Sequence, residues 1–376
     1  MFKGMERRLF VGALATAAGV GFAAGCYKTL PESAGEEGAV GESGIGVSGN
    51  VALAANSTPC SLPALRQTRP VLKPMRLQPG DTIGFVAPAG PLRHVKDELK
   101  NALHLAEGLG LRCELGKHVT DTYGYLAGSD EARASDFNRF ARDPQIRGIF
   151  ALRGGYGTMR VLNGIDYEAL AANPKVVLGF SDLTALLNAI MLQTGLVTFH
   201  GPVAAHPVTA TAVEGIKRAV MSAEPLGTMR VSGVGSLAHG EAHGRLVGGN
   251  LSMIAAMSGT PFAVPCGGNI LMLEEVNEAP YRVDRLLTQL RLNGDLGSVT
   301  GLALGQFVNC VPKIDDDRPS FTVEEVLRDC LAGLKKPMIT RMNVGHIDDQ
   351  WTLPIGMPVS FDGNAGNFTV AHSAVA

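Results

Sequence analysis

The sequence predicts an α/β protein with two lobes. The first lobe is a parallel sheet with helices on both faces, and the second is an α+β lobe rich in β-strand. Apolar runs that end in glycine or proline turns alternate with segments of helical apolar spacing up to about residue 207. Such alternation builds a parallel sheet. Beyond about residue 208, short strand-like pieces separated by glycines predict the second lobe.

The first 26 residues are predicted to be an export signal rather than part of the fold. A basic start with Arg7-Arg8 precedes an apolar run rich in alanine and glycine, which is typical of a secretory signal. The arginine pair resembles a twin-arginine signal. The segment ends in Ala-Ala-Gly-Cys26, which resembles a bacterial lipoprotein box. We expect a periplasmic protein with a lipid anchor on Cys26; the alternative is an ordinary cleaved signal, with Cys26 incidental.

Four further segments follow the predicted signal. Residues 27–71 are rich in glycine, alanine, serine and glutamate, and cannot bury enough apolar surface to offset the entropy of ordering. They are predicted to be a flexible tether. An N-terminal α/β domain is expected over residues 72–207, a linker region over 208–240, and a β-rich C-terminal domain over 241–372. Two lobes create a cleft, which is the usual place for a site.

The elements of the first lobe follow from periodicity and turn residues. Strands are expected within 81–91, 111–119, 146–157, 176–180 and 196–203. Helices are expected over 92–109 and 130–142, in a segment between 157 and 176, and directly after residue 180.

The second lobe shows a mixed pattern. Residues 268–294 predict a strand, a turn and a helix, and residues 300–309 predict another strand. A helix is expected within 320–334, since Thr322 and Glu325 have the spacing of a capping box. A last β segment is expected to end near residue 370.

Composition excludes several classes of protein. A formal net charge of -2, with no basic stripe and an aromatic fraction of 6%, argues against nucleic acid as a partner. The Gly154-Gly155-Tyr156-Gly157 turn does not fit the G-x-G-x-x-G spacing, and no Walker lysine is present, which disfavours nucleotide binding. The six cysteines contain no CxxC pair, so no zinc site is expected. One periplasmic disulfide is compatible with the sequence, with its pairing left open.

Candidate catalytic residues gather where strands end. Ser181-Asp182 follows an apolar strand and opens a helix, so Ser181 is either a helix N-cap or a nucleophile at a strand–helix elbow. The amide of Asp182 and an amide of the Gly154-Gly155 turn are candidates to cradle an oxyanion.

A serine nucleophile needs a base, and the base needs an orienting acid. Of nine histidines, His200 and His346 each follow a strand. Glu274 ends an apolar strand, and because strand side chains alternate, only one of Glu274 and Glu275 can point inward. The trio Ser181, Glu274 and His346 is one hypothesis that this pattern supports, with His200 as an alternative base.

Six blocks of sequence together resemble the LD-carboxypeptidase family of serine peptidases, and they occur in that family's order. They span roughly residues 78–372 and read GGYGTMRVLNGIDY, GFSDLTALL, FHGPV, GGNLSMIAAMSGTPF, LEEVNEAPYRVDRLLTQL and VGH. The resemblance implies a Rossmann-like N-terminal lobe, a β-rich C-terminal lobe and a homodimer. It also implies no metal and no cofactor.

The resemblance assigns roles to individual residues. It implies Ser181 as nucleophile, His346 as base and Glu274 as the acid that orients it, with the backbone amides of Gly155 and Asp182 as oxyanion donors. Phe180 is a departure, because tyrosine or histidine commonly precedes the serine in the family.

The implied reaction is hydrolysis of the bond between the L-centre of a diamino acid and the terminal D-alanine of a peptidoglycan stem tetrapeptide. The partner is then a muropeptide, with membrane contact only through the lipid anchor. Family members are often cytosolic, so the export signal departs from the family's usual setting. Two alternatives are an exported, lipid-anchored binding protein of two lobes, and a family member that cleaves another peptide or amide conjugate.

Overall fold

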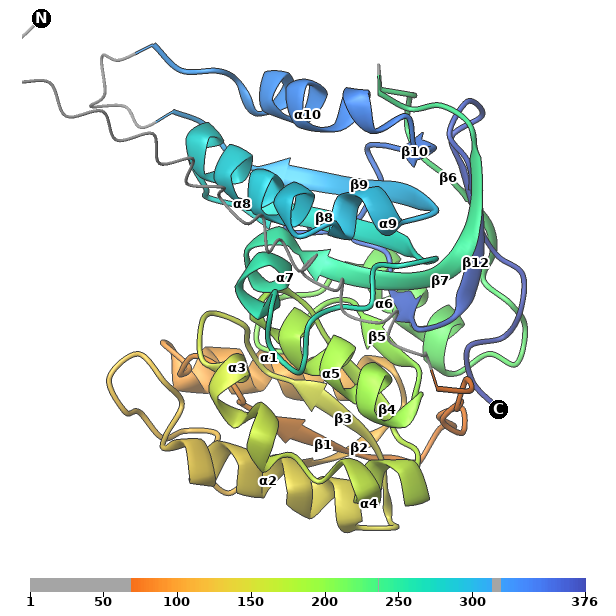
Figure 1. Cartoon of the computed structure of the whole chain (residues 1–376). Helices are drawn as coiled ribbons and strands as arrows, with labels where there is room; N and C mark the ends of the chain where they lie inside the picture. The colour runs from red at the N-terminus through yellow and green to blue at the C-terminus, as the bar shows by residue number, and fades with distance from the viewer. Residues whose placement is uncertain (1–68, 236, 313–318) are drawn as a thin grey trace, which may run out of the picture. The chain divides into compact units, whose positions relative to one another are not determined.

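The computed structural model describes residues 69–235, 237–312 and 319–376. The predicted export signal, Cys26 and the predicted tether up to residue 68 lie outside the described residues. All described residues belong to one compact unit, which contains a six-stranded and a seven-stranded sheet (Figure 1). Among the described residues, no helix combines the length and the apolar character that crossing a membrane requires.

The first sheet has the strand order β11-β5-β4-β3-β1-β2. Five strands pair in parallel, as predicted, and β11 joins the edge antiparallel to β5. The strands are β1 (Thr82–Val86), β2 (Arg112–Leu115), β3 (Ile146–Ala151), β4 (Val176–Gly179), β5 (Thr198–His200) and β11 (Leu353–Ile355). The central strands are apolar and buried along almost their whole length, as expected for a parallel sheet covered on both faces.

Helices cover both faces of this sheet, as predicted. They are α1 (Val95–Gly108), α2 (Asp130–Arg142), α3 (Thr158–Val161), η1 (Leu162–Gly164), α4 (Tyr167–Ala172), η2 (Ser181–Leu183) and α5 (Thr184–Thr194). The connection through α1 leads from β1 to β2, toward one edge of the sheet. The connections through α2, α4 and α5 lead in the opposite direction along the strand order. Right-handed crossovers therefore place α1 on the opposite face from α2, α4 and α5, and these three pack against one another in turn.

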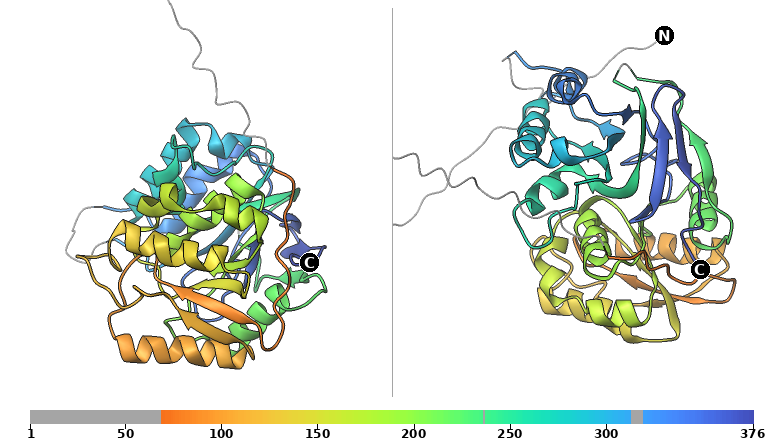
Figure 2. Two further views of the ribbon diagram at one scale, coloured as in Figure 1. Left: turned by 90° about the horizontal axis from the view of Figure 1, so that it is seen from below. Right: turned by 45° about the vertical axis from the view of Figure 1, so that its right-hand side comes forward.

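The second sheet has the order β10-β9-β8-β7-β12-β13-β6. Its strands are β7 (Glu241–Asn250), β8 (Ile270–Val276), β9 (Gly301–Val308) and β10 (Met338–Ile339), which are parallel, and β12 (Pro358–Asp362), β13 (Asn367–Val370) and β6 (Gly227–Arg230), which add an antiparallel edge. The right-hand view of Figure 2 shows the dark blue strands near the C-terminus beside the green strand β7. This mixed sheet is the β-rich lobe that the sequence predicted.

Helices of the second lobe join its parallel strands. They are α7 (Leu251–Met257), α8 (Pro280–Leu292), α9 (Asp295–Ser298), α10 (Val323–Leu331) and η3 (Ala332–Leu334). The predicted capping box opens α10: Glu325 N–H donates to the Thr322 hydroxyl, and the Glu325 carboxylate accepts from the Thr322 backbone. This part of the prediction is confirmed.

The chain passes between the two sheets more often than the predicted boundaries imply. Residues 208–240, expected to be a linker, contain α6 (Ala210–Val220) and the edge strand β6. Strand β11 lies within the predicted C-terminal domain, yet it pairs with β5 of the first sheet. The two lobes are therefore interleaved at these segments.

Candidate active site

Ser181 occupies a sharp turn between β4 and α5. Its backbone φ is +63°, a left-handed conformation that costs a non-glycine residue of order 1–3 kcal/mol and that gathers at functional sites. The turn continues through η2 into α5, and neither helix is capped by the serine side chain. The N-cap interpretation of Ser181 is therefore wrong, and the geometry is that of an elbow that presents a hydroxyl at the end of a strand.

The structure brings Ser181, His346 and Glu274 into one chain of hydrogen bonds. His346 Nε2 lies 3.0 Å from the Ser181 hydroxyl, and His346 Nδ1 lies 2.9 Å from Glu274 Oε2. The serine comes from the first lobe, whereas the acid lies on β8 and the histidine follows β10 in the second. A hydroxyl, an imidazole and a carboxylate in this order can move a proton away from the hydroxyl.

Glu274 is fully buried at a break in the register between β8 and β9. One carboxylate oxygen faces His346, and among the described residues the other, Oε1, has no hydrogen-bond partner. The loop that carries His346 approaches this carboxylate through Gly345, which has a φ of +113°. A Cβ at Gly345 would lie 2.9 Å from Glu274 Oε2, so glycine is required for this close approach.

The neighbouring acid, Glu275, points away from the serine, in agreement with the predicted alternation. Its carboxylate accepts from Asn250 Nδ2 at 2.9 Å and from Ser252 N at 2.8 Å. Burial raises the pKa of Glu275, and its hydrogen bonds oppose that rise. This carboxylate therefore holds the beginning of α7, whereas Glu274 serves His346.

Hydrogen bonds between the lobes fix the serine turn against the acid. Asn188 Nδ2 on α5 donates to Gly248 O at 3.0 Å, and Gly248 N donates back to Asn188 Oδ1 at 3.0 Å. One helical turn earlier, the Thr184 hydroxyl accepts from Asn250 N at 3.0 Å. Asn250 pairs with Glu274 across the β7–β8 ladder, so these bonds set the distance between the serine and its acid.

Sequence analysis did not identify Thr184 and Asn188. The signal that could have found them is a pair of polar residues four apart in a helix whose other residues up to Leu192 are apolar. A helix of that composition is buried all round, and two polar side chains on one buried face must then find partners on a neighbouring element.

The glycine loop after β3 passes directly beside the serine. A Cβ at Gly154 would lie 3.2 Å from the Ser181 hydroxyl and 3.6 Å from the amide nitrogen of Asp182. Gly90 N donates to Gly154 O at 3.1 Å. Because a trans peptide is planar, the N–H of Gly155 points the opposite way from that carbonyl. Both candidate oxyanion amides, on Gly155 and Asp182, thus belong to backbone that adjoins the hydroxyl.

Two buried side chains hold this glycine loop in place. The Asp182 carboxylate accepts from the backbone N of Thr158 at 2.8 Å and also from the Thr158 hydroxyl. Burial raises the pKa of Asp182, and the bonds from Thr158 oppose the rise. Arg133 Nη1 donates to Gly157 O at 2.9 Å and to Pro88 O. The side chain of Asp182 therefore anchors the loop, and only its amide faces the site.

Replacing Gly154 with alanine is expected to lower kcat about 100-fold while the fold is retained. The added methyl group would crowd Ser181, with a Cβ–Cβ distance of 3.0 Å, and would displace the candidate oxyanion backbone; losing one such donor costs about 100- to 1,000-fold. Steady-state kinetics and thermal unfolding would check this. Gly108→Ala is the matched control, since a Cβ there meets nothing within 4 Å. Full activity of Gly154→Ala would contradict the assigned geometry.

His200, the alternative base, is fully buried behind the site. Its ring lies 5.9 Å from the ring of Phe180, which in turn lies 4.8 Å from the ring of His346. Burial lowers the pKa of His200 to about 4, although nearby Glu274 opposes the shift. Because His346 is the histidine that contacts the serine hydroxyl, the structure favours His346 as the base over a neutral, enclosed His200.

This buried histidine predicts a specific acid sensitivity. In the unfolded chain His200 takes up a proton near pH 6.5, whereas in the folded protein it does so only near pH 4. Between these values unfolding binds a proton, so stability falls as the pH falls, by about 3 kcal/mol over the whole window. Chemical denaturation of wild type and His200→Leu at pH 7.5 and pH 4.5 would check this. Between pH 7.5 and pH 4.5 the wild type should lose more stability than His200→Leu. A stability difference between the two proteins that does not change with pH would contradict this prediction.

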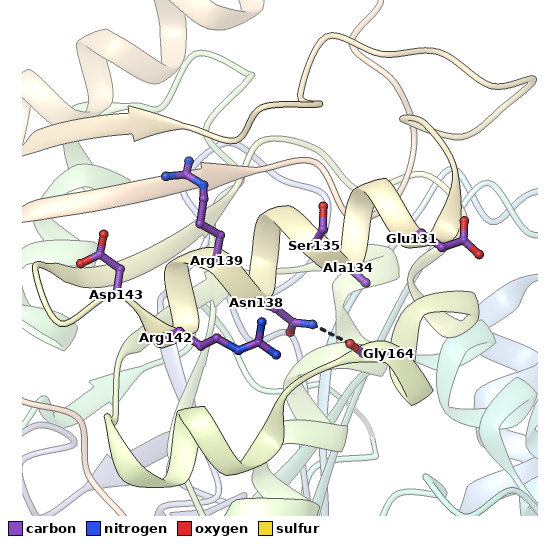
Figure 3. Close-up of a pocket in the computed structure, with 8 residues that line it drawn as sticks. All are labelled: Glu131, Ala134, Ser135, Asn138, Arg139, Arg142, Asp143 and Gly164. Carbon is purple, nitrogen blue, oxygen red and sulfur yellow. Dashed lines mark hydrogen bonds between the residues drawn. The ribbon is translucent and has the colours of Figure 1, made fainter.

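A pocket of about 780 Å³ lies along α2 (Figure 3). Its lining includes Asn138, which donates to Gly164 O at 2.7 Å, and Arg142, which pairs with Asp166 at 2.6 Å. None of the residues of the hydrogen-bonded chain lines it. These contacts are those of a polar helix surface against its neighbour, and we assign the pocket no function.

Metal ligands and thiols add nothing to the site in the described part of the chain. Residues 69–235, 237–312 and 319–376 hold no group of three side chains suited to a metal ion. Cys113, Cys266, Cys310 and Cys330 are free thiols, and Cys26 and Cys60 lie outside the described residues. A disulfide is therefore not formed among these four.

This fold and site define a member of the LD-carboxypeptidase family. The family's N-terminal domain matches residues 83–201 and its C-terminal domain matches residues 243–361. The chain therefore belongs to that family, as the sequence motifs indicated, and is a carboxypeptidase rather than a binding protein without activity.

Individual relatives agree with this membership. The chain is 38% identical over 292 residues to a probable murein peptide carboxypeptidase of Bacillus subtilis, which covers 76% of this chain and 89% of the relative. The crystal structure of muramoyltetrapeptide carboxypeptidase from Oxalobacter formigenes matches with a TM-score of 0.68 at 30% identity, covering 76% and 97% of the two chains. Microcin C7 self immunity protein MccF, in its wild-type apo state, matches with a TM-score of 0.72 at 25% identity, covering 81% and 100%.

Proposed function

We propose that this protein hydrolyses the bond between the L-centre of the diamino acid and the terminal D-alanine of peptidoglycan tetrapeptides. The observation that carries the proposal is the hydrogen-bonded chain Ser181–His346–Glu274, at 3.0 and 2.9 Å, in a member of the LD-carboxypeptidase family. Relatives named murein peptide and muramoyltetrapeptide carboxypeptidases support the substrate class.

In the proposed mechanism the serine attacks the scissile carbonyl carbon. Neutral His346 takes the hydroxyl proton on Nε2 as the Oγ–C bond forms, and Glu274 accepts from Nδ1–H and stabilises the imidazolium. His346 then gives the proton to the amine of D-alanine as the C–N bond breaks. Water, deprotonated by the same imidazole, attacks the acyl-enzyme and releases the shortened peptide with the serine restored.

The developing oxyanion is assigned to the amides of Gly155 and Asp182. Both belong to backbone beside the Ser181 hydroxyl, as the closeness of Gly154 to that turn indicates. A preorganised donor of this kind contributes roughly 3 kcal/mol to lowering the barrier. The single residue lost, D-alanine, leaves as a free amino acid.

Mass spectrometry of purified muropeptides before and after incubation with the enzyme tests the proposal. Conversion of tetrapeptides to tripeptides, with free D-alanine, is expected. A peptide–nucleotide conjugate belongs in the same panel, because structures of the microcin C7 self immunity protein resemble this one. Cleavage of that conjugate with intact tetrapeptides would replace the proposed substrate class.

We further propose that the protein is exported to the periplasm and anchored by a lipid on Cys26. The basic start, the apolar run and the Ala-Ala-Gly-Cys26 end support this. Fractionation of cells that express wild type or Cys26→Ser tests it: the wild type should sediment with membranes and the variant should not. Wild-type protein in the soluble fraction would contradict the lipid anchor.

The homodimer that the family resemblance implies is tested separately, by size-exclusion chromatography with light scattering.

A further inference from the structure

Two exposed tyrosines form a ring pair beside the glycine loop. Tyr125 is 66% exposed and Tyr156 is 49% exposed. Their ring centroids lie 5.4 Å apart at an interplanar angle of 69°. We call these two residues the tyrosine platform. Tyr125 belongs to the loop between β2 and α2, and Tyr156 to the loop between β3 and α3.

The platform stands on backbone that is fixed to the serine site. Tyr123 and Leu126 exchange both backbone hydrogen bonds, at 2.8 and 3.0 Å, so the loop that carries Tyr125 is a tight turn. Ala127 N donates to Ala89 O at 3.0 Å, and a Cβ at Gly157 would lie 2.5 Å from Leu126 Cδ2. The loop is therefore packed against both neighbouring turns. Rings held in this way lose little freedom when a ligand covers them.

The position of the platform limits what can cover it. Tyr156 directly follows Gly155, whose amide is assigned to the scissile carbonyl, and consecutive Cα atoms lie about 3.8 Å apart. With the length of a tyrosine side chain added, the ring of Tyr156 lies within about 15 Å of that carbonyl. A peptide advances by at most about 3.5 Å per residue, so the platform is within reach of substrate residues up to about four positions from the scissile bond.

Only one side of the substrate is long enough to reach them. On the leaving side a carboxypeptidase substrate has a single residue, D-alanine, which ends near the serine. On the acyl side the diamino acid is followed by the remainder of the stem peptide and the sugar that carries it. Tyrosine supplies a large, amphipathic contact area with few rotatable bonds, which suits such a surface.

We propose that Tyr125 and Tyr156 form an acyl-side subsite, which binds the part of the muropeptide that precedes the diamino acid. This inference rests on the proposed function and adds the residues that make the enzyme favour a long substrate over a short one. The platform contacts neither the scissile bond nor the proton path, so its contribution is to binding, and it should appear in KM.

Two substrates separate this role from a role in catalysis. One is a muramoyl tetrapeptide, and the other is an N-acetylated diaminoacyl–D-alanine dipeptide, which lacks everything that precedes the diamino acid. The readout is the ratio of kcat/KM for the long substrate to that for the short one. In the double variant Y125A/Y156A this ratio should fall about tenfold, through KM for the long substrate.

Two further variants serve as controls. Y123A removes a tyrosine that is 65% exposed on the same turn but outside the ring pair, and it should keep the wild-type ratio. Y125F/Y156F keeps the rings and should keep most of the ratio. An unchanged ratio in the double variant, whether kcat/KM falls equally for both substrates or for neither, would overturn the subsite. Wild-type enzyme inactive on both substrates would instead overturn the proposed function, and the subsite with it.

Discussion

Replacing Ser181 with alanine is expected to reduce the release of D-alanine from a tetrapeptide by about 10⁴-fold or more. The hydroxyl is the atom that His346 contacts at 3.0 Å, and without it no acyl-enzyme forms; nucleophile variants of serine peptidases lose rate on this scale. The measurement is kcat from a coupled assay for free D-alanine.

The Ser181→Ala variant should keep its fold and its affinity for substrate. Alanine bears the same φ of +63° at a similar cost. The hydrogen bond that Asn188 donates to Gly248 O and the one that Thr184 accepts from Asn250 N hold the lobes together, and neither involves the serine side chain. Thermal unfolding and equilibrium binding of a tetrapeptide are the controls. A variant that releases D-alanine at more than a few per cent of the wild-type rate would rule out Ser181 as nucleophile.

Glu274→Gln is expected to lower kcat by about 10³- to 10⁴-fold. The carboxylate holds His346 Nδ1 at 2.9 Å and stabilises the imidazolium. A glutamine side chain is neutral and cannot stabilise that positive charge. The corresponding change in a serine protease triad lowers kcat by about 10⁴-fold. Glu274 Oε1 has no hydrogen-bond partner in the part of the chain that the structure describes, and burying such a carboxylate is costly, so stability should be unchanged or higher. Kinetics and chemical denaturation measure the two effects separately.

Glu275→Gln is the matched control, one residue along the same strand. Its carboxylate binds Asn250 and Ser252, so the change should weaken the start of α7 and lower stability, with kcat altered far less than in Glu274→Gln. The reverse pattern, with Glu275→Gln inactive and Glu274→Gln near normal, would show that the acid had been assigned to the wrong member of the pair.

Sequence patterns were enough to predict the first lobe and the types of residue at the site. Parallel strands and the capping box at Thr322 depend on local apolar spacing and on residues three positions apart, which a single sequence displays. Ser181, Glu274 and His346 were candidates because each follows or ends a strand, yet spacing alone left His200 open. The order of the family's motifs distinguished them, and the elbow geometry then removed the N-cap interpretation.

What the sequence could not give depends on contacts between distant segments. Strand β11 pairs with β5 across about 150 residues, and no local pattern records that choice. The bonds from Asn188 to Gly248 join positions that local propensity treats as helix and strand. Strand β6, in the expected linker, has its partner at the far end of the chain. Partner identity is a tertiary property, so these features required the structure.

In the proposed mechanism, Glu274 acts through His346 on the serine, as one proton path. The most direct test combines Glu274→Gln and His346→Ala and measures kcat for D-alanine release from each single variant and from the double variant. Residues that act as a unit have non-additive effects, so the double variant should be no slower than His346→Ala alone. A further loss of about 10³-fold in the double variant, or near-normal activity of His346→Ala, would contradict the account.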